Sequence, residues 1–187
     1  MSLRLSGGRK LHSPPGQTAR PTPSRVRLAV MNMLAPQLGG ARWLDLCCGS
    51  GVMGCEALQR GAAAVVAVDQ DRRMAATAKA NLALVASGLD PAPAVAVVQQ
   101  EVTHWLQQAQ GIEPFDLIYA DPPYAAGLYG AISQAVQAGQ WLRPAGLLLL
   151  ECASDRVPPL APEWVLQRQK RYGGSTVLVL EPEGSPA

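Results

Sequence analysis

Long apolar runs are missing from this chain of 187 residues. No stretch approaches the roughly 20 consecutive apolar residues that a membrane-spanning helix requires. The N-terminus has Ser6, Gly7, Gly8, Arg9 and Lys10 where a signal peptide would have its apolar segment. We therefore expect no membrane partner, and a cytoplasmic location is the expected default.

Metal-binding patterns and histidines are also scarce. The cysteines show neither C-x-x-C nor zinc-finger spacing, which argues against a structural metal; they are Cys47, Cys48, Cys55 and Cys152. One histidine, His12, lies in a Gly- and Pro-rich arm, and the other, His104, opens a short expected helix. Neither has the neighbours of a general base. We expect reduced cysteines packed in the core.

Acidic residues are absent from the first 44 positions, where seven basic residues occur. All 14 acidic residues follow, although the net charge of the whole chain is only +2. A basic head on a mildly acidic body favours a polyanionic partner such as nucleic acid, the alternative being an ordinary solvated tail. With 48% apolar and 16% charged residues, we expect one domain at 24–187 behind a basic arm at 1–23.

Alternating apolar patterns predict a doubly wound α/β domain. Strands are expected at 42–46, 64–68, 94–99, 115–120 and 146–152, followed by a hairpin of strands at 165–170 and 176–181. Helices are expected at 25–35, at 52–59, from Asp71 to Gly88, around Trp105 and at 128–138. We expect Ser24 to cap the first helix, and Arg25 and Arg27 to point away from its apolar face.

A glycine-rich turn follows the first strand. Gly49 to Gly54 satisfies G-x-G-x-x-G, and Asp69 lies 20 residues after Gly49, at the end of the second strand. Such a turn lets backbone approach a ligand, and the acid suits ribose hydroxyls, so an adenosine cofactor is predicted. Asp45, just before the turn, suits a cationic or amine-bearing ligand better than a pyrophosphate. A nicotinamide dinucleotide is therefore the weaker alternative.

The fourth strand ends in Asp121-Pro122-Pro123-Tyr124. Both prolines lack a backbone N–H, so the strand cannot continue and a stiff loop follows. The Asp121 carboxylate and the Pro122 carbonyl are two acceptors for the two hydrogens of an exocyclic NH2, and Tyr124 offers a face for stacking. The loop therefore indicates an amine on a planar base; an ordinary strand-ending turn is the alternative.

Together these motifs resemble the S-adenosylmethionine-dependent methyltransferases that act on exocyclic amines. The stretches similar to the bacterial 16S ribosomal RNA (guanine-N2)-methyltransferase family are Gly8-Arg9-Lys10, Arg20-Pro21-Thr22 with Arg25-Val26-Arg27, 44–51, and Lys170-Arg171-Tyr172-Gly173. The resemblance spans residues 4–181. It implies a Rossmann-like class I methyltransferase with a seven-stranded, mostly parallel sheet and a C-terminal antiparallel hairpin.

The resemblance also implies a cofactor, partners and roles. S-adenosyl-L-methionine would be the cofactor, and 16S ribosomal RNA or the small ribosomal subunit the partner. The cofactor-binding residues would be Asp45, Cys47, Gly49 and Gly51 at the methionine end, Asp69 at the ribose, and Glu101 and Val102 beside the adenine. The catalytic residues would be Asp121, Pro122 and Tyr124. The RNA-binding residues would be Arg9, Lys10, Arg20, Arg25 and Arg27.

Three alternatives stay open at this point. An adenine-N6 methyltransferase on RNA or DNA would use the same loop, although nothing after the sheet remains to build a DNA-reading region. A methyltransferase for protein glutamine resembles Asn-Pro-Pro-Tyr rather than the Asp-Pro-Pro-Tyr found here. A nicotinamide-dependent oxidoreductase or a nucleotide-binding module would use the glycine turn alone.

Overall fold

The computed structural model of the protein describes residues 3–14 and 22–184. Its strands are β1 (Arg42–Leu46), β2 (Ala64–Asp69), β3 (Ala94–Gln99), β4 (Phe115–Ala120), β5 (Leu142–Ala153), β6 (Trp164–Tyr172) and β7 (Ser175–Pro182). Its helices are α1 (Ser24–Met33), α2 (Ala35–Leu38), α3 (Val52–Gln59), α4 (Arg72–Ala86), α5 (Val102–Gln108), the 3-10 turn η1 (Tyr124–Ala126) and α6 (Tyr129–Ala138). None of these helices is long and apolar enough to cross a membrane.

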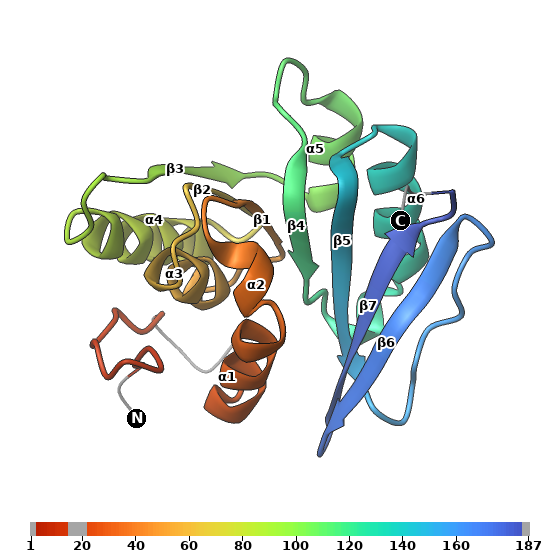
Figure 1. Ribbon diagram of the computed structural model, residues 1–187, viewed down its shortest axis with the longest axis horizontal. Coiled ribbons are helices and arrows are strands. Elements are labelled where there is room, and N and C mark those ends of the chain that lie inside the picture. The colour runs from red at the N-terminus through yellow and green to blue at the C-terminus, as the bar shows by residue number, and fades with distance from the viewer. Residues whose placement is uncertain (1–2, 15–21, 185–187) are drawn as a thin grey trace.

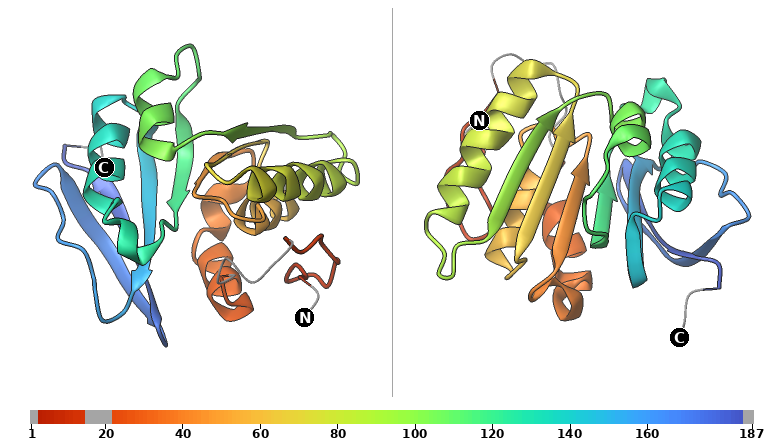
Figure 2. Two further views of the ribbon diagram at one scale, coloured as in Figure 1. Left: turned by 180° about the vertical axis from the view of Figure 1, so that it is seen from behind. Right: turned by 90° about the horizontal axis from the view of Figure 1, so that it is seen from above.

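The strands form one sheet in the order β3-β2-β1-β4-β5-β7-β6 (Figure 1). The first five are mutually parallel, β7 is antiparallel to β5, and β6 is antiparallel to β7. The prediction of a mostly parallel, seven-stranded sheet with a terminal antiparallel hairpin is therefore confirmed. Parallel strands require crossover helices, and these cover both sides of the sheet (Figure 2).

Two apolar clusters pack on opposite faces of the sheet. One joins α1–α4 to alternate strand residues, among them Trp43, Val65, Leu117, Tyr119, Val177 and Val179. We call this side the α1 face. The other joins α5 and α6 to the intervening residues, among them Leu44, Val68, Ile118, Leu150, Leu178 and Leu180. We call this side the α6 face. The period of two along each strand divides the side chains between these two cores.

Several element boundaries differ from the predictions. Pro23, and not Ser24, stands at the N-cap of α1, and Ser24 is already helical. Proline is preorganised for a helix start because its φ is fixed, and Pro23 has φ −56°. Strand β5 begins at Leu142, four residues earlier than expected, because its ladder to β4 shifts register and accommodates Pro144.

The N-terminal arm is tied to the domain. Leu5 and Leu11 are each 3% exposed and join the core on the α1 face, which the sequence analysis did not anticipate. The fully buried Asn81 of α4 accepts from the amide of His12 at 2.8 Å and donates to its carbonyl at 3.0 Å. Two arm residues, Arg4 and Lys10, form an antiparallel bridge.

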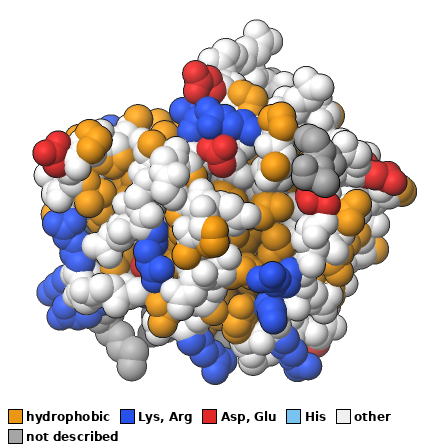
Figure 3. All heavy atoms as spheres, in the orientation of Figure 1, with side chains coloured by type: hydrophobic (Ala, Val, Ile, Leu, Met, Phe, Trp, Pro, Cys, Tyr) orange, Lys and Arg blue, Asp and Glu red, His pale blue; other side chains and the backbone are white. Residues whose placement is uncertain are grey.

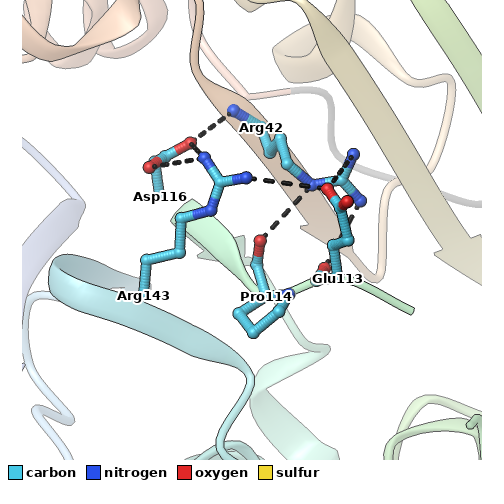
Figure 4. Close-up of polar contacts among 5 residues, drawn as sticks. All are labelled: Arg42, Glu113, Pro114, Asp116 and Arg143. Carbon is cyan, nitrogen blue, oxygen red and sulfur yellow. Dashed lines mark hydrogen bonds and ion pairs between the residues drawn. The ribbon is translucent and has the colours of Figure 1, made fainter. Parts of the chain in front are cut away.

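A cluster of ion pairs closes the amino-terminal edge of the sheet (Figure 4). Arg143 of β5 lies 3.0 Å from Asp116 of β4, whose carboxylate also accepts from the amide of Arg42 at 2.8 Å. The Arg42 guanidinium donates to the carbonyls of Glu113 and Pro114, both at 3.3 Å. The cluster thus joins β1, β4 and β5 at the edge opposite their carboxyl ends.

Candidate functional site

Three carboxylates gather at the carboxyl edge of the parallel strands. They belong to Asp45 in β1, Asp69 at the end of β2 and Asp121 directly after β4. Strand β1 lies between the other two, since Leu46 pairs with Val68 on one side and Ala120 on the other. Ligands in open α/β sheets bind at this edge, so the position agrees with a binding site.

The glycine turn leaves β1 in an unusual backbone conformation. Cys47, Gly49 and Gly51 all have positive φ, at 57°, 54° and 73°. The turn is fastened by Asp69, whose Oδ2 accepts from the Gly49 amide at 2.8 Å. The other oxygen of Asp69 accepts from the amide of Asp71 at 2.9 Å. Asp69 therefore couples the glycine turn to the start of α4, a role the sequence pattern did not reveal.

The buried carboxyl of Asp45 is 2% exposed and accepts from the Gly54 amide at 3.1 Å. Burial raises the pKa of Asp45 well above its usual value, and the charges of Asp121 and Asp69 add to that effect, while the Gly54 bond opposes it. A cationic ligand would relieve this repulsion, whereas a pyrophosphate would increase it. The three carboxylates therefore fit the sulfonium and ammonium groups of S-adenosylmethionine.

Cys47 begins the glycine turn and is half-buried. Burial raises the pKa of its thiol to about 12, with further increases from Asp69 and Asp121. A thiol with that pKa is neutral at pH 7 and is not an activated nucleophile. Cys47 is therefore suited to lining the turn and not to covalent catalysis.

The Asp121 loop lies directly beside the glycine turn. The Asp121 amide donates to the Leu46 carbonyl at 3.4 Å, so the loop is held against the end of β1. The hydroxyl of Thr22 is 3.5 Å from Asp121 Oδ2 and approaches from the segment before α1. Tyr124 begins the turn η1 and is 37% exposed.

A fourth acidic residue, which was not predicted from the sequence, is placed next to Asp121 by the strand pairing. Since Ala120 pairs with Leu150, the following residues Asp121 and Glu151 are neighbours across β4 and β5. Glu151 is 2% exposed; its carboxylate accepts from the hydroxyl of Tyr119 and its carbonyl from that of Tyr129. A single acid within the apolar run of β5 was the signal that could have identified it.

The expected adenine-side residues have structural contacts of their own. Glu101 is the N-cap of α5: its carboxylate accepts from the amides of Thr103 and His104 at 3.0 and 2.8 Å. These bonds lower the pKa of Glu101, although burial opposes them. Val102 is 3% exposed and belongs to the core on the α6 face, so little of its side chain remains for a ligand.

The predicted RNA-binding cations fall into different environments. Lys10 and Arg25 are exposed, whereas Arg9 is half-buried and reaches the Val85 carbonyl near the end of α4 at 3.4 Å. Arg20 lies outside the described residues.

Arg27 does not point away from the apolar face of α1, as we expected. It is 5% exposed and pairs at 3.3 Å with the buried carboxylate of Glu56 in α3. Its guanidinium also donates to the carbonyls of Thr22 and Arg4. Because these contacts occupy its donors inside the protein, we exclude Arg27 from the candidate RNA-binding surface.

Comparison with known proteins agrees with this site. The model of the family described as conserved hypothetical protein 95 matches residues 5–181. Ribosomal RNA small subunit methyltransferase D of Escherichia coli K12 is 34% identical over 91% of this chain and 85% of its own length. The Haemophilus influenzae protein of that name is 32% identical, over 89% of this chain and 84% of its own.

A solved structure, yhhF of Escherichia coli, is provisionally named a methyltransferase and superimposes with a TM-score of 0.81. It is 32% identical and covers 98% of this chain and 99% of its own. The fold is thus that of the class I methyltransferases, and the chain belongs to the conserved hypothetical protein 95 family, together with the small-subunit methyltransferase D proteins.

Proposed function

We propose that the protein is an S-adenosylmethionine-dependent methyltransferase that modifies the exocyclic N2 of a guanine in 16S ribosomal RNA of the small subunit. The observation that carries the proposal is the contact between the Asp121 loop and the end of β1, where the glycine turn begins. The glycine turn follows Leu46, and the Asp121 amide donates to the Leu46 carbonyl at 3.4 Å. A cofactor on the glycine turn and a base on the Asp121 loop would therefore be adjacent, as group transfer requires.

On the cofactor side, two acids and two glycines would share the binding. Asp45 would face the cationic methionine end, and Asp69 would accept from the ribose hydroxyls while holding Gly49. When bound, S-adenosylmethionine supplies an electrophilic methyl group on a sulfonium. The positive φ values of Gly49 and Gly51 support this role, because they let backbone lie where a side chain would interfere.

On the substrate side, the difficulty is a weakly nucleophilic nitrogen. The N2 lone pair of guanine is delocalised into the ring, so hydrogen bonds from N2–H to Asp121 and to the Pro122 carbonyl would localise electron density on nitrogen. Tyr124 would stack on the base, a contact worth about 1–3 kcal/mol in similar cases. Alignment and electrostatics would supply most of the acceleration. The base must leave its stack to reach the loop.

Methyl transfer to RNA tests the proposal directly. Labelled S-adenosylmethionine would be incubated with the protein and either unmodified small subunits or naked 16S RNA, followed by nucleoside analysis. We expect label in N2-methylguanosine. Label in N6-methyladenosine would keep the loop chemistry and overturn the guanine assignment. Binding of NAD in preference to S-adenosylmethionine, measured by calorimetry, would overturn the cofactor assignment.

The role of Asp121 gives a sharper prediction. The substitution Asp121→Ala should abolish methyl transfer and leave cofactor affinity largely unchanged, because the carboxylate acts on the base. Asp155→Ala is the matched control, since Asp155 is an exposed acid in the loop after β5. Unchanged turnover in Asp121→Ala would contradict the mechanism. Equal losses in both variants would indicate a general charge effect.

A further inference from the structure

The antiparallel hairpin of β6 and β7 reaches the same edge as the candidate site. Ala153, at the carboxyl end of β5, pairs with Ser175 at the start of β7, so the turn at Gly173 and Gly174 lies at the carboxyl edge. In Figure 1 this turn extends to the lower edge of the molecule, near α1 and beyond the carboxyl ends of β4 and β5. The hairpin is therefore placed to contact a large substrate.

Charge is distributed unevenly along this hairpin. The turn end of β6 has Arg168, Lys170 and Arg171, all exposed. The acidic residues are at the other end, where Glu181 pairs with Val165 and accepts from the Gln167 side chain. Figure 3 shows blue Lys and Arg side chains along the lower edge of the molecule, while the red Asp and Glu side chains in that view lie mainly in its upper half.

Two of these cations lie on the α1 face, the face from which Thr22 contacts Asp121. Directly paired residues of antiparallel strands project to the same side. Arg168 pairs with Val179 and Lys170 with Val177, and both valines belong to the core on the α1 face. Arg171 pairs with Thr176, next to Val177, and so projects to the α6 face.

Arg25 connects this surface to the candidate site. Its guanidinium donates to the Tyr172 carbonyl at 3.5 Å, and a side chain on Gly173 would collide with it. The residues just before Arg25 lead back to Thr22, whose hydroxyl lies 3.5 Å from Asp121. Arg25 and Thr22 thus connect the hairpin turn to the loop of the target base.

We propose that Arg168 and Lys170, at the turn end of β6, bind the phosphates of the RNA strand that flanks the methylated base. This inference rests on the proposed function, and it extends the RNA surface to the opposite end of the chain from the N-terminal arm. Phosphate contacts position a nucleic acid without reading its sequence, which suits a site whose chemistry is concentrated on one base.

A protein strand is the other occupant that an edge strand can accept, because β6 ends the sheet and no strand among residues 3–14 and 22–184 pairs with its outer side. Two observations favour RNA. Basic side chains on an edge strand oppose pairing with another strand. Strand β6 also contains three basic residues and no acidic residue. A polyanion is the complementary partner for such a surface.

The test compares two faces of the same strand. Lys170→Gln and Arg168→Gln, singly and combined, would be compared with Arg171→Gln, which removes an equal charge from the opposite face. RNA affinity would be measured over a series of salt concentrations, with KM and kcat for methyl transfer. We expect the slope of log affinity against log salt to fall by about one per residue. KM for RNA should rise more than kcat falls, with Arg171→Gln close to the wild type.

Three outcomes would overturn the inference. The first is an unchanged slope and KM in the double variant beside an active wild type, which leaves the proposed function standing. The second is an equal effect of Arg171→Gln, which would make the effect one of net charge. The third is weaker binding to whole subunits with unchanged binding to naked RNA, which would indicate a protein partner. A wild type that neither binds nor methylates RNA would instead contradict the proposed function itself. Thermal unfolding would confirm that each variant is folded.

Discussion

At the scale of single residues, the candidate site depends on backbone conformations and hydrogen bonds that a sequence motif predicts only in part. Cys47 adopts a positive φ, although it has a Cβ and the pattern places the glycines at other positions of the turn. Non-glycine residues in this region are uncommon and carry strain. The motif predicted where the turn lies and which acids border it. It could not predict that Asp69 fastens Gly49, since that depends on distances between β1 and β2.

The buried carboxyl of Asp45 predicts a pH dependence of cofactor binding. Burial raises its pKa, so the neutral form persists to higher pH than in an ordinary Asp. A cationic cofactor favours the charged form, and affinity should therefore fall as the pH drops through the raised pKa. The pKa of Asp69 is also raised by burial and should contribute in the same direction. Calorimetric titration of S-adenosylmethionine at several pH values would measure this.

Asp45→Asn provides the comparison, because it keeps an oxygen for the Gly54 amide but has no titrating charge. Its affinity should be lower at neutral pH and should vary less with pH than that of the wild type. An equally steep pH dependence in this variant would show that Asp45 is not the group responsible.

Gly51 predicts a second local effect. Its φ is 73°, and a Cβ there would approach the Cβ of Ala78 in α4 to 3.0 Å. Gly51→Ala should therefore lower stability by about 1–2 kcal/mol from the left-handed backbone alone, and should weaken cofactor binding. Gly130→Ala is the control, because the space around Gly130 in α6 is open. Thermal unfolding and calorimetry would measure both variants, and equal stabilities would contradict the prediction.

At the scale of elements, the bounds of three parallel strands and one helix could be predicted to the residue, including those of β3 at the exposed edge of the sheet. The predicted bounds of β1, β3 and β4, and those of α3, agree with the structure, because each is a short apolar or patterned run with clear breakers. Strand β5 was predicted too short, since Pro144 argues against a strand and the register shift that admits it is a tertiary feature. The predicted orientation of Arg27 was wrong because its partner, Glu56, lies 29 residues later in the sequence.

The buried pair of Arg27 and Glu56 joins α1, α3 and the arm. Removal of the Glu56 carboxylate should leave the buried charge of Arg27 without its ion-pair partner. Glu56→Ala should therefore lower the free energy of unfolding by about 3–5 kcal/mol. Denaturant unfolding would measure the loss. Glu113→Ala is the control: the side chain of Glu113 is 71% exposed, and its ion pairs should contribute less than about 1 kcal/mol. Similar losses in the two variants would contradict a special role of the buried pair.

At the scale of the whole molecule, the sheet order brings together segments that are distant in the chain. The residues before α1, the end of β4 and the turn of the β6–β7 hairpin meet at one edge. No local pattern contains this information, since it follows from the pairing of strands and the packing of α1. The sequence therefore predicted candidate site residues, but not which distant segments surround them.

The side chain of Asn81 links the N-terminal arm to the glycine turn. Its side-chain amide donates both to His12 in the arm and to the Ser50 carbonyl in the glycine turn, each at 3.0 Å. Because both contacts use one buried side chain, ordering either segment fixes the Asn81 amide in place for the other. Ordering one segment then reduces the cost of ordering the other. If the arm binds RNA as proposed, a cofactor that orders the turn would raise the affinity for RNA, and RNA would raise the affinity for the cofactor by the same factor.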